Sequence, residues 1–461
     1  MFYEFKFEYF NIVLHIIDMQ NDYSELSKSL TEGLSEEVKK KQGIFFSPQK
    51  SIIRCVNYIN NILKHDYTTV LEPSCGSCEF INYLDKQEGL NITGIEYNEQ
   101  IFETIKSISF RNHFIPIHGD FLDYETTQKY DLIIGNPPYF VIPKNKIDKK
   151  YHPYIAGRPN IFLVFIIKSL ALLSDNGILA FILPKSFLNC SYYTKVREYI
   201  YHTFHVKKIM DCSDDKYIET QQDTFILILK KTKKKFSNDK YFIPNNLIMN
   251  TENNIKTMKK ITKDSTTLHQ MGFEVLNGNF VWNQERTSLT NNTEDVRLLY
   301  SGDIIGGKLR TINTDDVNER WDEYHQKMDA LNDLFKNDET NEKLIKKKKT
   351  LLDKIEKKHY VISDKHPNKQ IEGMSLIINR GYGNTVYILD YALVELDKYY
   401  LENHVLVIKY SGDISNEELK DKYEMVINSF KSEKTKTFVD LCMGNNAMNT
   451  TELEYLLPIF K

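Results

Sequence analysis

Short apolar runs alternate with longer amphipathic or polar stretches through the first half of the chain. Four of these runs are rich in branched residues and end at a glycine or next to polar residues, as buried strands of a parallel sheet do. They cover residues 68–72, 91–97, 114–118 and 131–135. An amphipathic helix pattern precedes the first run. The alternation predicts an α/β domain built on a mostly parallel sheet.

Further elements continue this pattern. Residues 158–168 begin a helix that is apolar nearly all round and therefore buried, with Asn160 as its expected cap. Residues 24–42 are expected to form one charged surface helix. The amphipathic helix that precedes the first strand is expected to begin at Pro48, with Ser47 as its N-cap. An exposed hydroxyl at Ser47 could also touch a ligand. Three more strands are predicted at residues 177–184, 206–210 and 224–229, and a helix is predicted at residues 191–202.

The fourth strand leads into a proline corner, Asn136-Pro137-Pro138-Tyr139. The prolines fix φ and donate no N–H, so the loop is stiff, and it lies at the carboxyl end of a strand, where open α/β sheets bind ligands. The Asn136 side-chain oxygen and the Pro137 carbonyl can accept both hydrogens of an exocyclic amine, and Tyr139 can stack on its base. The amine lone pair then becomes available to attack a methyl group. The alternative is a stiff turn in which Tyr139 only packs.

Polar residues also follow the other three strands. The turn after the first strand, residues 72–76, has the position of a nucleoside-cofactor cradle, although the full GxGxxG pattern is absent. Glu96 ends the second strand, where a carboxylate can accept ribose hydroxyls. Asp120 and Phe121 follow the third strand and suit an adenine amine and ring. Each acidic residue alone also fits a solvated loop, but together with the proline corner they predict one pocket.

Composition restricts the class of protein. The 461 residues are 41% hydrophobic and 27% charged, which is typical of two or three globular domains, and the net charge of −3 gives no global sign of a nucleic-acid binder. Six scattered cysteines predict reduced intracellular thiols. Cys75 and Cys78 lack the second pair that a zinc finger needs, so no metal is expected. Without a recognisable signal peptide or membrane-spanning run, a cytoplasmic protein with access to DNA is expected.

The motifs of residues 43–230 occur in the order of one enzyme family. They are Phe46-Ser47-Pro48, Leu71-Glu72-Pro73-Ser74-Cys75-Gly76, Ile95-Glu96-Tyr97, Gly119-Asp120-Phe121 and Asn136-Pro137-Pro138-Tyr139. This segment resembles the gamma class of S-adenosylmethionine-dependent DNA adenine-N6 methyltransferases, which occur in type II restriction–modification systems. The resemblance implies a Rossmann-like class I methyltransferase domain with a mostly parallel, seven-stranded sheet, and S-adenosyl-L-methionine as the cofactor.

The resemblance also implies roles for individual residues. The catalytic residues would be Asn136, Pro137, Pro138 and Tyr139. Cofactor contacts would come from Ser47, Glu72, Pro73, Ser74, Cys75, Gly76, Glu96, Asp120, Phe121 and Pro138. Tyr217 falls where the family has a second base-stacking aromatic, and an ordinary exposed loop tyrosine is an equal alternative. Cys78 stands where the family loop often has a second glycine, which affects how closely the backbone approaches the cofactor.

The sequence predicts three segments: an N-terminal arm over 1–42, a catalytic domain over 43–240 and a DNA target-recognition domain over 241–461. The lysine-rich residues 230–235 mark the border, as a linker or as a phosphate-contacting run. Beyond them, a looser resemblance predicts a mixed α+β domain. Its charged segment at about 317–358 suggests a helical hairpin, which could follow the DNA backbone or remain solvated.

The expected reaction is methyl transfer from S-adenosylmethionine to N6 of an adenine that is flipped out of duplex DNA. The alternatives are a methyltransferase of the same fold acting on RNA adenine or protein glutamine, and a degenerate DNA-binding module. Double-stranded DNA is the expected partner, and a separate cognate restriction endonuclease would be a second one. No membrane association is expected, and the chain is expected to act as a monomer.

Overall fold

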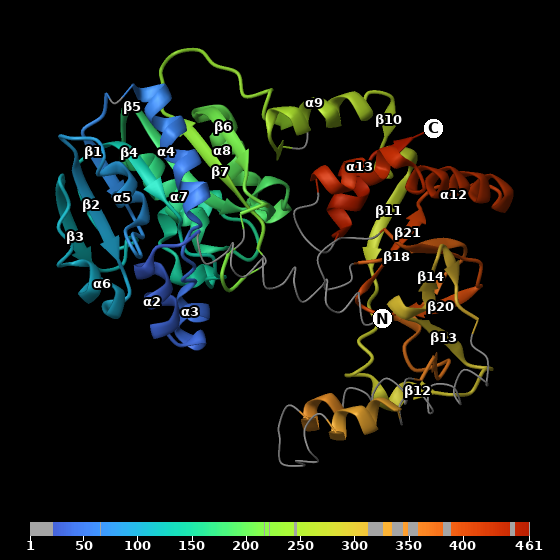
Figure 1. The fold of residues 1–461 in the computed structure, drawn as a ribbon. Coiled ribbons are helices and arrows are strands. Elements are labelled where there is room, and N and C mark those ends of the chain that lie inside the picture. The colour runs from blue at the N-terminus through green and yellow to red at the C-terminus, as the bar shows by residue number, and fades with distance from the viewer. Residues whose placement is uncertain are drawn as a thin grey trace, which may run out of the picture. The chain divides into compact units, whose positions relative to one another are not determined.

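The computed structural model divides the chain into two compact units (Figure 1). The first comprises Met1–Ile261 and Leu441–Asn445, and the second Thr262–Asp440 and Asn446–Lys461. The structure describes residues 22–64, 66–215, 217–220, 222–243, 247–311, 326–333, 344–348, 358–380, 389–442 and 448–460.

A seven-stranded sheet in the order β3-β2-β1-β4-β5-β7-β6 forms the centre of the first unit. Its strands are β1 (Thr69–Glu72), β2 (Asn91–Glu96), β3 (His113–His118), β4 (Tyr130–Gly135), β5 (Leu173–Pro184), β6 (His205–Asp211) and β7 (Thr224–Lys230). The first five are parallel, and β7 runs antiparallel to both of its neighbours. The predicted Rossmann-like methyltransferase fold is confirmed. Because the strand order reverses between β1 and β4, a ligand crevice is expected at their carboxyl ends.

Helices cover both faces of this sheet. On one face, α4 (Gln49–Leu63), α5 (Glu79–Leu84) and α6 (Glu99–Ile105) pack on strand residues such as Val70 and Leu132. On the other, α7 (Ile161–Leu172) and α8 (Thr194–Thr203) pack on their sequence neighbours Leu71 and Ile133. Neighbouring strand residues point to opposite faces, so two buried faces require the continuous apolar runs seen in the sequence. Short elements complete this unit: β8 (Phe242–Ile243), β9 (Ile248–Met249) and α9 (Glu252–Ile261).

Two predictions for the N-terminal region are wrong. Residues 24–42 form two helices, α2 (Glu25–Gly33) and α3 (Glu36–Gln42), because Ser35 caps the second helix. They are also not a purely exposed surface: Leu30 and Leu34 are buried against the core, and burial of each leucine is worth about 1.5–3 kcal/mol. The N-cap of α4 is Pro48 and not Ser47, whose side chain is buried.

The second unit is a mixed α+β domain. Its two larger sheets have the orders β11-β21-β18-β19 and β12-β16-β13-β20-β17. Its strands are β10 (Ser265–Thr266), β11 (Phe273–Asn277), β12 (Leu289–Thr290), β13 (Val296–Leu299), β14 (Ile304–Ile305), β15 (Lys308–Leu309), β16 (Tyr360–Val361), β17 (Ile371–Glu372), β18 (Ser375–Asn379), β19 (Tyr391–Val394), β20 (Lys398–Leu401), β21 (Val405–Tyr410) and β22 (Ile459–Phe460). The helices α12 (Asn416–Phe430) and α13 (Glu433–Cys442) follow the larger strands. The predicted helical hairpin at 317–358 lies largely outside the described residues.

Within the described part of the chain, no helix is long and apolar enough to cross a membrane. The same residues contain no group of three or more metal-binding side chains placed around a common point.

Candidate functional site

A cavity of about 590 Å³ opens at the carboxyl ends of β1 to β4. Eight residues that the sequence predicted for the site line it: Pro73, Ser74, Gly76, Glu96, Asp120, Phe121, Asn136 and Pro138. The other predicted residues, which are Ser47, Glu72, Cys75, Pro137, Tyr139 and Tyr217, are not part of the cavity wall. The carboxyl ends of parallel strands meet at one edge of the sheet, which explains why residues spread over 66 positions of sequence share one cavity.

A wall of the cavity comes from the N-terminal segment, which the sequence did not assign to the site. Gln42, Gly43 and Phe45 line the cavity. Gly43 ends α3 in the left-handed region, with φ of 66°. A methyl group there would come within 2.9 Å of the Tyr139 backbone nitrogen, so only glycine permits this close packing. A glycine placed just after a helix rich in lysine was the available sequence signal.

Glu96 is buried at the end of β2, and both of its oxygens accept backbone hydrogen bonds. Oε2 accepts from Gly76 N at 2.9 Å and Oε1 accepts from Asn98 N at 2.8 Å. Burial raises the pKa of Glu96, and these hydrogen bonds oppose the rise. The arrangement couples the loop after β1 to the loop after β2, and a bound ribose would meet an oriented carboxylate.

The loop after β3 is held by a lysine that sequence analysis missed. Lys168 Nζ donates to the Leu122 carbonyl at 2.8 Å and lies 5.0 Å from the centre of the Phe121 ring. Asp120 Oδ1 accepts from Leu122 N at 2.8 Å. Burial lowers the pKa of Lys168 and raises the pKa of Asp120. In the sequence, Lys168 is noticeable as the one charged residue of the otherwise apolar helix α7, which indicates that it has a specific partner.

Glu72 lies behind the loop after β1, nearly fully buried. Its Oε2 has no hydrogen-bond partner among the described residues. Burial, followed by nearby Cys78, Glu79 and Glu96, raises the pKa of Glu72 well above its ordinary value. Glu72 lies outside the cavity wall, so this oxygen is a buried acceptor behind the loop and not a lining atom of the cavity.

The proline corner is oriented by side-chain hydrogen bonds. Asn136 Nδ2 donates to the Phe45 carbonyl at 3.0 Å, so the amide oxygen is turned the other way. That oxygen accepts from the Tyr139 hydroxyl at 2.5 Å, and the same hydroxyl lies 2.8 Å from the Ile182 carbonyl. The Tyr139 ring packs edge-on against Phe162, with centroids 6.0 Å apart. The aromatic face expected from the sequence is therefore not turned into the cavity in this structure.

Tyr217 is 5% exposed, so the alternative of an ordinary exposed tyrosine is wrong. It lies beside Phe45 and Phe46.

Burial, followed by nearby Tyr217, raises the pKa of Tyr139 well above its ordinary value. The Tyr139 hydroxyl consequently stays protonated at neutral pH and cannot act as a general base.

Comparison with known proteins agrees with this geometry. Residues 58–218 match the family model described as Eco57I restriction-modification methylase. The chain is 25% identical over 448 residues to the type II methyltransferase M.CvrRI of Paramecium bursaria Chlorella virus XZ-6E, covering 95% of this chain and 99% of the relative. It is 34% identical over 200 residues to the type II methyltransferase M.AccI of Acinetobacter calcoaceticus, covering 40% of this chain and 35% of that relative.

The resemblance to methyltransferases of type II restriction–modification systems is confirmed. The enzyme class is that of a methyltransferase, with S-adenosylmethionine as its cofactor, as the sequence predicted. Among solved structures, the DrdV–DNA complex aligns with a TM-score of 0.48 at 13% identity, covering 91% of this chain and 56% of that chain. The type IIG restriction endonuclease BpuSI aligns with a TM-score of 0.42 at 12% identity, and the alignment covers 94% of this chain and 60% of the BpuSI chain.

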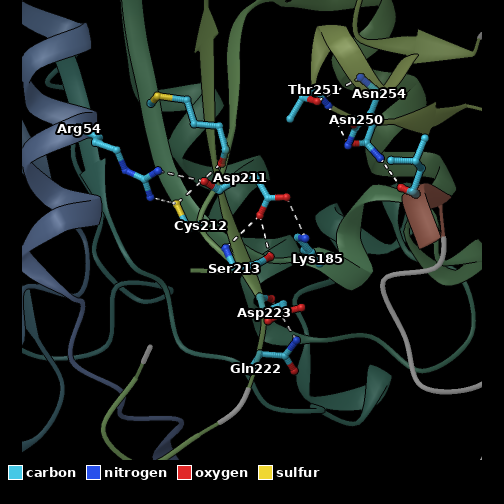
Figure 2. Close-up of polar contacts among 12 residues, drawn as sticks. Arg54, Lys185, Asp211, Cys212, Ser213, Gln222, Asp223, Asn250, Thr251 and Asn254 are labelled. Atoms are coloured by element: carbon cyan, nitrogen blue, oxygen red, sulfur yellow. Dashed lines mark hydrogen bonds and ion pairs between the residues drawn. The ribbon is translucent and has the colours of Figure 1, made fainter. Parts of the chain in front are cut away.

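A polar cluster fixes the loops beside the methyltransferase site (Figure 2). Lys185, which follows β5, pairs with Asp211 at the end of β6 at 2.9 Å, and its backbone N–H donates to the Asp223 carbonyl at 3.0 Å. Asp211 also accepts from Ser213 Oγ at 2.7 Å, and Arg54 of α4 donates to the Asp211 carbonyl at 3.1 Å. These contacts hold both ends of the loop that carries Tyr217.

The first prediction concerns Cys78, which caps α5 with φ of 60°. Glycine removes left-handed strain of about 1–2 kcal/mol, and the loss of a small buried side chain costs a similar amount. We therefore expect Cys78→Gly to change the free energy of unfolding by less than about 1 kcal/mol and to retain or tighten cofactor binding. Calorimetric titration with S-adenosylmethionine and chemical denaturation measure both.

Cys75→Gly is the matched control. Cys75 is also buried but is not among the non-glycine residues with positive φ in the described chain. The same truncation there relieves no strain, so it should destabilise the protein by more than Cys78→Gly does. A large loss of cofactor binding in Cys78→Gly alone would contradict the prediction.

The second prediction concerns pH. Because burial raises the pKa of Glu96, this carboxylate gains a proton at a higher pH than an exposed glutamate does. A protonated carboxyl is a poorer acceptor for ribose hydroxyls, so cofactor affinity should fall as the pH is lowered from about 8 to 5. In Glu96→Gln the affinity should be weak and its pH dependence flatter. Calorimetry across this range tests it, and an unchanged pH profile in Glu96→Gln would refute the role of Glu96.

Proposed function

We propose that the chain transfers a methyl group from S-adenosylmethionine to N6 of an adenine flipped out of duplex DNA. The observation that carries the proposal is the oriented amide of Asn136. Its nitrogen donates to the Phe45 carbonyl, so its oxygen is presented as an acceptor, which the Tyr139 hydroxyl occupies in this structure. Asn136 also lines the same cavity as Glu96. An acceptor for the substrate amine and a carboxylate for the cofactor ribose thus share one cavity.

The residues around the cavity have these proposed roles. Glu96 would hold the ribose, Asp120 and Phe121 the adenine of the cofactor, and residues 72–76 together with Pro138 its methionine end, with Ser47 behind them. The bound cofactor supplies an electrophilic methyl group. Asn136 Oδ1 and the Pro137 carbonyl would accept the two hydrogens of the substrate amine, and they would stabilise the positive charge that builds there during transfer.

Binding of the base requires a rearrangement at Tyr139. In this structure its hydroxyl occupies Asn136 Oδ1, the acceptor that the substrate amine needs. We propose that the ring turns out of its contact with Phe162 and stacks on the entering base, while Tyr217 supports the base from the region of Phe45. Stacking of a base on an aromatic side chain is worth roughly 1–3 kcal/mol, which offsets part of the cost of unstacking it from the duplex.

Duplex DNA is favoured over the alternative substrates. An RNA adenine or a protein glutamine also carries an amine that this acceptor pair could hold. The matched relatives, however, are modification methylases of type II systems, and M.CvrRI aligns over 95% of this chain, including the second unit. We propose that the second unit reads the DNA sequence. A separate endonuclease of the same specificity would be its partner in restriction. We propose that the chain acts as a monomer, since the residues that we assign to the cofactor and to the base all belong to the first unit.

The third prediction is that Asn136→Ala lowers methyl transfer by at least about 100-fold, because it removes a preorganised acceptor, while cofactor binding persists. Transfer is measured as labelled methyl incorporated into plasmid DNA, with N6-methyladenine identified by mass spectrometry of the nucleosides. Asn91→Ala is the matched control, since Asn91 is exposed at the opposite end of β2. Retained turnover in Asn136→Ala would refute the proposal.

The fourth prediction separates the two parts of Tyr139. Tyr139→Phe keeps the ring and releases Asn136 Oδ1 from the hydroxyl, so substantial activity should remain. Tyr139→Ala removes the stacking surface and should lower kcat/KM by roughly 10- to 100-fold. Steady-state kinetics on plasmid DNA tests this. Equal losses in both variants would show that the hydroxyl, and not the ring, carries the function.

A further inference from the structure

A basic surface loop follows the catalytic loop directly. Residues 141–160 contain five exposed cations, Lys144, Lys146, Lys149, Lys150 and Arg158, and one carboxylate, Asp148. With His152 neutral, the loop has a net charge of +4, whereas the whole chain has a net charge of −3. It begins two residues after Tyr139, the predicted base-stacking residue, so this charge is concentrated next to the site.

The loop is ordered and anchored at both ends. Its base is closed by two backbone hydrogen bonds of 3.0 Å, from Ile142 N to the Pro159 carbonyl and from Ile161 N to the Phe140 carbonyl. Two short 3₁₀ helices, Lys144–Lys146 and Lys149–Tyr154, form its body. Three of its side chains, Ile147, Tyr151 and Ile155, are buried in the core cluster that contains α7. The positive charges therefore lie on a fixed surface next to the catalytic loop.

Most of these charges are uncompensated within the protein. Lys150 pairs with Asp148 at 3.0 Å. The side chains of Lys144, Lys146, Lys149 and Arg158 have no hydrogen bond or ion pair with any residue that the structure describes. Elsewhere in the first unit, exposed lysines such as Lys40 and Lys106 pair with glutamates one helical turn away. Four free cations on one anchored loop make a surface that attracts a polyanion.

We propose that the loop of residues 141–160 binds the phosphates of duplex DNA next to the flipped adenine. This inference rests on the proposed function, since it assigns part of the DNA surface to the catalytic unit. Phosphate contacts carry no base information, but they fix where a duplex lies on a protein. Phosphate contacts in the loop that directly follows the proline corner would set the position of the target nucleotide relative to Asn136.

The test is the salt dependence of DNA binding. The triple variant Lys144→Gln, Lys149→Gln, Arg158→Gln removes three free cations and leaves Lys146, which lines the cavity, and Lys150, which pairs with Asp148. Binding of a fluorescent DNA duplex of random sequence is measured by anisotropy at several NaCl concentrations. The duplex has about 30 base pairs, so that it is longer than the stretch the protein covers. The slope of log K against log salt should fall by about 2–3, because each phosphate contact contributes about 0.9.

A matched control removes the same charge at another edge of the sheet. The control variant is Lys64→Gln, Lys86→Gln, Arg111→Gln, which replaces two exposed lysines and one exposed arginine. These residues precede the parallel strands β1, β2 and β3, so they lie at the edge of the sheet opposite the catalytic loop. The control should keep the wild-type slope. An unchanged slope in the loop variant, or an equal decrease in the control, would overturn the inference.

Two further measurements separate this inference from the proposed function. The loop variant should bind S-adenosylmethionine with wild-type affinity and unfold at the wild-type temperature, which shows an intact cavity. If the wild-type protein methylates plasmid DNA and the loop variant keeps the wild-type salt slope, only the inference fails. If the wild-type protein methylates structured RNA and not DNA, both the inference and the proposed function fail.

Discussion

The hydrogen bond from the Asn136 amide to the Phe45 carbonyl is the contact on which the proposed catalytic arrangement depends. Two prolines fix the backbone of the corner but not the rotation of the amide, whose two ends have almost the same shape. Neighbours decide which end carries the nitrogen, and here the Phe45 carbonyl accepts from the nitrogen while the Tyr139 hydroxyl donates to the oxygen. Phe45 lies 91 residues earlier in the chain, so packing of the N-terminal segment on the cleft contributes to the orientation of the amide.

The acidic groups under the cavity illustrate how burial is balanced. Glu79 accepts from Ser27 at 2.7 Å and also binds Ser24, and Glu96 accepts from two backbone amides. Glu72 keeps one oxygen without a partner among the described residues. A buried polar group without a partner is costly, so it persists where a ligand completes its bonding. Three buried carboxyl groups, at the end of β1, the start of α5 and the end of β2, therefore differ in how fully hydrogen bonds compensate their burial.

Much of the first unit could be predicted from the sequence because its physical causes are local. Buried parallel strands require continuous apolar runs, so all seven strands were placed close to their observed positions. Eight predicted residues line one cavity because parallel topology brings strand ends together. The single helix at 24–42 and the Ser47 cap were wrong, since Ser35 and Pro48 acted as local caps within a polar stretch. The roles of Phe45 and Lys168 could not be predicted, because both act on backbone or side-chain groups far away in sequence.

The bond between Tyr139 and Asn136 has a consequence for the resting enzyme. A protein that stores an activated methyl donor is exposed to wasteful alkylation of water and of small amines. While the phenol occupies the amide oxygen, such molecules cannot engage both of the acceptors proposed to hold an amine. Under the proposed mechanism, a base that stacks on the Tyr139 ring frees that oxygen as it binds. In that mechanism, methyl transfer depends on the binding of an aromatic substrate, and the bound cofactor stays unreactive in its absence.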